Sequence, residues 1–84
     1  MLLLPSIKVG AWRLVVIPGD HEPRHVHARY GSAEANEVVA EIAADGTVKI
    51  RRANRALSRA QVRRALELVA EYSAGLMQLW ETYC

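Results

Sequence analysis

Residues 37–51, which read EVVAEIAADGTVKIR, decide the fold. Apolar and polar side chains alternate in two runs, 37–42 and 47–51, and the pair Asp45-Gly46 lies between them. Alternation with a period of two is typical of strands buried on one face, and Asp-Gly between two such runs is a strong signal for a tight turn. The sequence therefore predicts an antiparallel β-hairpin at this point.

Similar runs upstream predict a larger sheet. Residues 25–30 (HVHARY) alternate and stop at Gly31, whereas residues 11–17 (AWRLVVI) are rich in aromatic and branched side chains and stop at Pro18. Because successive side chains of a strand point to opposite faces, about four strands would give one polar face and one apolar face. The predicted apolar face consists of Trp12, Leu14, Val16, Val26, Ala28, Tyr30, Val38, Ala40, Ile42, Val48 and Ile50.

Downstream, the spacing of apolar residues changes to that of a helix. Ser58 is a suitable N-cap, and apolar residues recur at steps of three or four from Val62 to Tyr83. Gly75 lies inside this stretch, where it can kink the helix, and two helices are the alternative to one. We therefore predict an α+β fold in which a small antiparallel sheet of about four strands packs on one long C-terminal helix, kinked or straight. The 84 residues are expected to form a single domain, residues 1–84, that is too small to enclose a large cofactor.

Positive charge is concentrated between the predicted sheet and helix. Residues 51–64 contain six arginines and no acidic residue, although the chain has a formal net charge of only +2. Arginines in the first turns of a helix oppose its macrodipole, so these side chains are expected to contact nucleic acid or an acidic protein partner. A solvated helix face is the alternative. The six residues are Arg51, Arg52, Arg55, Arg59, Arg63 and Arg64.

Export and membrane insertion are not expected. The apolar run at residues 1–4 ends at Pro5 and is shorter than the core of a signal peptide, which has about 7–15 apolar residues. Cys84 is the only cysteine, as expected in a reducing compartment. These features predict a cytoplasmic protein without membrane contact. Apolar helix residues that cannot all face the sheet leave room for a homodimer surface.

All three histidines fall within the segment GDHEPRHVHARYG, residues 19–31. His25 and His27 are two positions apart on a predicted strand, so both rings project from one face with Cα atoms about 6.5–7 Å apart. Folding of a small sheet does not require this grouping. We therefore predict a functional site near the loop that precedes residue 25.

A metal ion is one interpretation of this cluster. Two imidazoles on one strand face can bind a divalent cation such as zinc, and His21, Asp20 or Glu22 is available as a third ligand. The predicted ligand set is His21, His25 and His27.

Acid and base catalysis without a cofactor is a second interpretation. Imidazole can take up or release a proton near neutral pH, so His25 and His27 could act on an RNA phosphodiester. His21 would be a third catalytic or positioning group, and Arg24 and Arg29 would bind phosphate.

Two simpler roles remain open for the same side chains. They could hold nucleic acid without catalysis. Alternatively, the histidines pair with Glu37 or Glu41 on the adjacent strand as ordinary cross-strand neighbours.

The segment from His21 to Gly31, HEPRHVHARYG, resembles the DUF4160 family of small bacterial proteins. Its most specific part is the pattern H-x-P-x-H-x-H-A-x-Y-G, supported by Leu76-Met77 before Trp80, and the similarity spans about residues 7–83. The family pattern often has a second proline, an aromatic residue, a helix histidine and an asparagine at or near positions where this chain has Arg24, Val26, Tyr72 and Leu79.

The resemblance implies a bacterial or phage origin and a toxin-antitoxin-like setting with a small DUF2442-type protein as partner. With the histidine cluster, it leads us to expect a toxin-like protein that acts on RNA or another nucleic acid. A divalent-metal-binding protein and a non-enzymatic interaction module, such as an antitoxin or regulator, are the alternatives.

Overall fold

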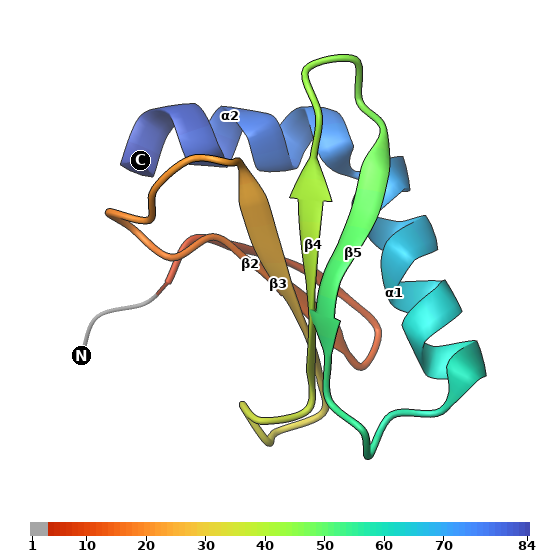
Figure 1. Cartoon of the computed structure of the whole chain (residues 1–84). Helices are drawn as coiled ribbons and strands as arrows, with labels where there is room; N and C mark the ends of the chain where they lie inside the picture. The colour runs from red at the N-terminus through yellow and green to blue at the C-terminus, as the bar shows by residue number, and fades with distance from the viewer. Residues whose placement is uncertain (1–3) are drawn as a thin grey trace.

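Five strands form one antiparallel sheet in which every strand pairs with its neighbour in the sequence (Figure 1). The computed structural model describes residues 4–84, so only Leu4 of the apolar run at residues 1–4 falls within it. Because the sheet order follows the chain, residues close in sequence also lie close in the sheet. The strands are β1 (Ser6–Val9), β2 (Trp12–Val15), β3 (His25–Tyr30), β4 (Glu37–Ile42) and β5 (Val48–Ala53).

The additional strand, where about four were expected, is β1 at the edge of the sheet. Its four residues, Ser-Ile-Lys-Val, alternate between exposed polar and half-buried apolar side chains, but a run of four is too short to predict a strand. A two-residue turn joins it to β2, since Val9 pairs with Trp12, and Gly10 in this turn has a φ of 58°. Glycine adopts a positive φ without strain, which suits it to this tight turn.

The structure confirms the hairpin predicted from residues 37–51, now β4 and β5. Gly46 has a φ of 88°, and the Asp45 carboxylate accepts a hydrogen bond of 2.9 Å from the amide of Thr47. β5 continues to Ala53, two residues beyond the predicted end.

A β-bulge in β5 determines which face its arginines occupy. Val39 pairs with Arg52 whereas Ala40 pairs with Ile50, so Arg51 is the additional residue. A bulge can bring consecutive side chains to the same side of a sheet. Arg51 and Arg52 accordingly line one depression on the polar face.

The predicted apolar face of the sheet forms the core together with both helices. Ile50, at the sheet edge, is the exception and is 44% exposed. Tyr30 and Val48 pack at the margin. The buried core consists of Trp12, Leu14, Val16, Val26, Ala28, Val38, Ala40, Ile42, Ala65, Leu68, Val69, Leu76 and Trp80.

Two helices, α1 (Arg59–Glu71) and α2 (Ser73–Tyr83), stand where one long helix was expected. Ser58 caps α1 as predicted: its hydroxyl accepts from the amide of Gln61, and the Gln61 side chain accepts from the amide of Ser58. The helices meet at Tyr72, whose φ of −101° and ψ of 17° are not helical. This break lets α1 pack along β3 to β5 while α2 runs across to β1 (Figure 1).

Gly75 lies within α2 and serves close packing, not the expected kink. A Cβ atom at this position would lie 3.3 Å from Cδ1 of Ile7 in β1. The missing side chain lets the helix approach the edge strand closely.

Within residues 4–84, no helix combines the length and the hydrophobicity needed to cross a membrane.

Candidate metal centre

Two histidines and an aspartate meet at the start of β3. His25 and His27 project from the same face of β3, as predicted from their spacing. Asp20 reaches them from the loop between β2 and β3. The amide of Gly19 in this loop donates a hydrogen bond of 3.1 Å to the carbonyl of Tyr83. The end of α2 therefore holds the segment that carries the aspartate.

The potential metal-binding atoms of these side chains converge. Asp20 Oδ2 lies 3.0 Å from His25 Nε2 and 3.5 Å from His27 Nε2, and the three donor atoms lie within 4.8 Å of one another. Two ligands that are each about 2.0–2.1 Å from a tetrahedral zinc ion lie about 3.3 Å apart. The observed distances fit an ion placed between these atoms.

Several of the converging atoms are buried without a hydrogen-bond partner. Within residues 4–84, Asp20 Oδ2 and both ring nitrogens of His27 have none. The side chains of His25 and His27 are only 11% and 10% exposed. Leaving one buried polar atom unsatisfied costs about 1–3 kcal/mol, so three in one cluster need an explanation. A cation shared by Asp20 Oδ2 and His27 Nε2 would satisfy two of them.

The backbone turns Nε2 of His25 toward Asp20. Nδ1 of His25 lies 2.8 Å from the carbonyl oxygen of Pro23. A carbonyl can only accept, so Nδ1 carries the hydrogen and donates it. In the neutral ring, the lone pair is then on Nε2 and faces the aspartate oxygen, which is unfavourable unless a proton or a metal ion lies between them. Holding a histidine by its far nitrogen is typical of metal sites.

Glu37 of β4 lies beside Nδ1 of His27, as the Pro23 carbonyl lies beside Nδ1 of His25. Its Oε2 lies 3.4 Å from His27 Nδ1, so Nε2 is left to face Asp20. The same carboxylate accepts hydrogen bonds from Arg29 at 3.2 Å and from Arg52 at 3.1 Å. Two guanidinium groups therefore hold the Glu37 carboxylate beside the ring of His27.

Apolar side chains form the inner wall of the site. Val15 and Val39 flank His27 on the neighbouring strands and are 2% and 3% exposed. The indole of Trp80 packs against His25 with ring centroids 5.4 Å apart. The outer side opens into a depression of about 370 Å³, which Arg51, Arg52 and His21 line together with the three converging residues. A small ligand could therefore reach the site from one side.

Comparison with known protein families gives one match. The model of the family described as a domain of unknown function, DUF4160, matches residues 12–81. The chain belongs to the DUF4160 family. This confirms the resemblance seen in the sequence, and the matched range includes Asp20, His25, His27 and Glu37. No curated protein and no solved structure matches the chain significantly.

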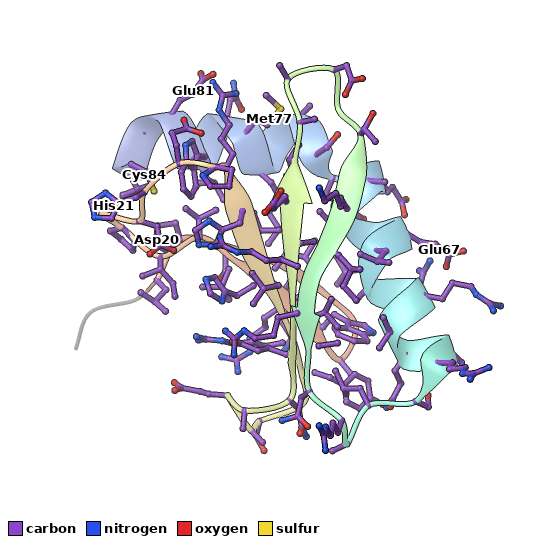
Figure 2. The ribbon with its side chains drawn as sticks, viewed as in Figure 1. Asp20, His21, Glu67, Met77, Glu81 and Cys84 are labelled. Carbon is purple, nitrogen blue, oxygen red and sulfur yellow. The ribbon has the colours of Figure 1, made fainter. Side chains whose placement is uncertain are left out.

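In this DUF4160 protein, His21 lies at the mouth of the site and not in the converging group. It is exposed and lies on the outer side of its loop (Figure 2). In the part of the chain that the structure describes, the converging donor atoms belong to Asp20, His25 and His27. The predicted histidine pair is brought together, and the third group comes from Asp20, which the sequence offered beside His21.

The two arginines predicted to bind phosphate are both engaged in ion pairs. Arg29 is 3.2 Å from Glu37, and its side chain is 11% exposed. Arg24 lies 3.7 Å from Glu22 and 3.9 Å from Glu81. Arg29 therefore supports the site from within, whereas Arg24 lies on the outside of the loop.

Four of the six arginines of residues 51–64 line two separate surfaces. Arg51 and Arg52 line the depression beside the histidines. Arg59 and Arg63 line a separate apolar groove between β5 and α1. The residues that line neither surface are Arg55 and Arg64.

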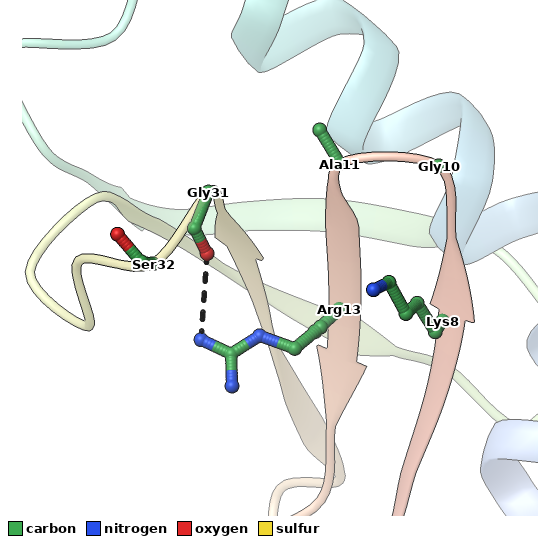
Figure 3. Close-up of a pocket in the computed structure, with 6 residues that line it drawn as sticks. All are labelled: Lys8, Gly10, Ala11, Arg13, Gly31 and Ser32. Atoms are coloured by element: carbon green, nitrogen blue, oxygen red, sulfur yellow. Dashed lines mark hydrogen bonds between the residues drawn. The ribbon is translucent and has the colours of Figure 1, made fainter.

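A further basic depression lies beside the turn between β1 and β2. Lys8 and Arg13 face each other across these strands and line it together with Gly31 and Ser32 (Figure 3). Arg13 donates a long hydrogen bond of 3.5 Å to the carbonyl of Gly31. Lys8 was not among the predicted site residues, because β1 was not expected.

Proposed function

We propose that this protein binds a divalent transition-metal ion through Asp20, His25 and His27. The observation that supports the proposal most is that the Nε2 atoms of both histidines lie within 3.5 Å of one buried carboxylate oxygen. The far nitrogen of each ring faces an acceptor, the Pro23 carbonyl or the Glu37 carboxylate. Two imidazoles and one carboxylate suit zinc and also iron, cobalt or nickel.

Such a centre would keep a coordination position for a substrate. Structural zinc sites usually have four protein ligands, whereas catalytic sites have three and leave one position free. Here the free position would face the depression that Arg51 and Arg52 line. A metal ion polarises a phosphoryl or carbonyl oxygen, and arginine favours phosphate and carboxylate groups. We therefore propose a phosphate-containing ligand or substrate for this site.

Action on a nucleic acid without a metal ion is the second candidate function. It is favoured by the position of Arg51 and Arg52 beside His25 and His27, since cations and imidazoles together suit cleavage of an RNA phosphodiester. In this case the protein would be the toxin-like component of a two-protein module in the bacterial cytoplasm, with a small DUF2442-type protein as partner.

Metal titration tests the first proposal. Protein purified without a metal-affinity tag and stripped with chelator should bind one equivalent of Co²⁺, with an absorption spectrum typical of nitrogen and oxygen ligands, and Zn²⁺ should displace it. Loss of a residue that only hydrogen-bonds to a metal ligand typically weakens metal affinity by about 10–100-fold. Asp20→Ala or His27→Ala removes a ligand itself and should weaken binding at least as much.

His21→Ala is the matched control, because His21 is a histidine of the same loop outside the converging group. It should bind cobalt like the parent. The metal centre is refuted if the parent shows no saturable binding, or if His21→Ala loses as much affinity as His27→Ala.

Cleavage assays separate the two candidates. A single-stranded RNA and the model diester bis(p-nitrophenyl) phosphate are incubated with metal-loaded and chelator-stripped protein. Cleavage that requires the metal supports the first proposal. Cleavage that persists in chelator and is lost in the His25→Ala/His27→Ala double variant supports the second.

A further inference from the structure

We infer that the groove between β5 and α1 binds an extended, acidic segment of a partner protein, which adds a sixth strand to the sheet. This inference does not require a bound metal ion: the groove lies at a different surface, and only Arg51 and Arg52 at the β5 edge also line the depression beside the histidines. Each can therefore fail without the other.

The groove is apolar at its floor and open to solvent. Its volume is about 490 Å³, and Ile50 of β5 and Val62 and Leu66 of α1 contribute to its lining. Ile50 is 44% exposed, whereas its cross-strand partner Ala40 is fully buried. An apolar side chain of an added strand would cover Ile50 in the way that β5 covers Ala40.

The edge of β5 can accept such a strand. β5 is the last strand of the sheet and pairs only with β4. An edge strand presents unpaired backbone donors and acceptors, which is how extended peptides add to sheets. Backbone pairing would supply the register, and the groove would receive every second side chain of the partner.

The charges around the groove select an acidic partner. Arg59 and Arg63 line it, and within residues 4–84 neither has a carboxylate within 4.0 Å. Both lie in the first turns of α1, which contains no acid in its first turn, so they oppose the helix dipole. Carboxylates of a partner would offset this cost.

The side chains on the polar face of β5 also favour an acidic partner. Lys49 of β5 is exposed there and has no carboxylate within 4.0 Å in residues 4–84, and the exposed Arg51 pairs only loosely with Glu41 at 3.9 Å. A strand that alternates acidic with apolar residues would therefore place its apolar side chains in the groove and its acids opposite these cations.

A second copy of this chain does not fit the edge of β5. Pairing β5 with β5 of another copy would bring Lys49, Arg51 and Arg52 of the two copies together, and like charges on paired strands are destabilising. A nucleic acid would satisfy the arginines but would leave Ile50, Val62 and Leu66 uncovered. An acidic protein segment satisfies both features.

The probe for the test is the peptide Glu-Val-Glu-Ile-Glu-Val-Glu, blocked at both ends, added to ¹⁵N- and methyl-labelled protein. Saturable NMR shifts are expected in the amides of Val48–Ala53 and in the methyl groups of Ile50, Val62 and Leu66. The outward-facing amides of β5 should also exchange more slowly with solvent. The same peptide with lysine in place of glutamate should bind at least about tenfold more weakly, a difference of about 1.4 kcal/mol.

Charge reversal supplies the matched variants. Arg59→Glu/Arg63→Glu should fold, because acids near a helix N-terminus are favourable, and should bind the glutamate peptide at least about tenfold more weakly than the parent. Arg64→Glu changes the same helix, but Arg64 is outside the groove and lies 3.7 Å from Glu67. This control should bind the glutamate peptide like the parent.

Four results would overturn the inference. One is no saturable shift in β5, and another is equal binding of both peptides. A third is a single-stranded RNA that shifts the groove residues while the peptide does not. The fourth is concentration-dependent dimerisation that Ile50→Lys abolishes, since the groove would then be occupied by a second copy.

Discussion

At the scale of single residues, Glu37 connects the fold to the proposed metal centre. Glu37→Gln keeps the size of the side chain but removes the charge that Arg29, Arg52 and His27 face. Metal affinity should fall by about 10–100-fold. Stability should fall by about 1–3 kcal/mol, because the nearly buried Arg29 loses its charged partner. Cobalt titration and urea unfolding measure the two effects.

Glu41→Gln is the control for this prediction. Glu41 lies on the same strand and face, and it pairs only loosely with Arg51 at 3.9 Å. Its loss should change metal affinity little. An equal loss of metal affinity in both variants would mean that the affinity depends on the total negative charge of this face. The contact between Glu37 and His27 would then have no specific role.

The histidine pair could be predicted from sequence, but its partners could not. His25 and His27 share a face because of the two-residue period of a strand, which is local geometry. His21 was predicted as the third ligand, with Asp20 and Glu22 as alternatives. The sequence could not decide among them, because the path of their loop depends on the contact between Gly19 and the distant Tyr83.

At the scale of elements, we expect the stability of the β4–β5 hairpin to depend on pH through Asp45. Hydrogen bonds from the side chain and then from the backbone amide of Thr47 lower the pKa of Asp45 below its usual value of 3.8. A carboxyl group with a lowered folded-state pKa stabilises the fold at pH values above its unfolded pKa. This contribution disappears as the pH falls through the folded-state pKa.

Asp45→Asn isolates the charge, since asparagine keeps an acceptor for the Thr47 amide. The variant should be modestly less stable than the parent at pH 7, and the difference should close below the unfolded pKa of 3.8. Urea unfolding between pH 7 and pH 2 checks this. A gap that stays constant over the whole range would contradict it.

Elements with a strong local signal were predicted, and those set by tertiary contacts were not. Asp45-Gly46 and the Ser58 cap mark their turn and helix start directly. β1 is short and half-exposed, so only pairing with β2 defines it. The break at Tyr72 lies inside an uninterrupted apolar stripe, and it follows from α1 and α2 packing on different strands.

At the scale of the whole molecule, binding of a metal ion at the proposed centre should contribute to stability. A ligand at 100 times its dissociation constant adds about 2.7 kcal/mol to the free energy of unfolding. In a domain of this size, about 1 kcal/mol shifts the melting temperature by about 4–8 °C. Saturating Zn²⁺ should therefore raise it by about 10–20 °C, as calorimetry of chelator-stripped protein would show.

Two controls show whether the rise in melting temperature comes from a transition-metal ion bound at Asp20. Asp20→Asn should lose it, and Mg²⁺, which prefers oxygen ligands, should not produce it in the parent. A rise that survives in Asp20→Asn would place the ion elsewhere on the protein.

The contact between the β2–β3 loop and the end of α2 also affects the kinetics of folding and unfolding. Each strand of the sheet pairs with its neighbour in the sequence, so β3 can form early in folding and bring His25 and His27 to one face. Asp20 comes into place only when its loop meets the end of α2, where Cys84 Sγ contacts the carbonyl of Ile17 across 67 positions of sequence. Closing so long a loop is entropically costly. A metal ion captured after this closure would slow unfolding and leave the folding rate almost unchanged.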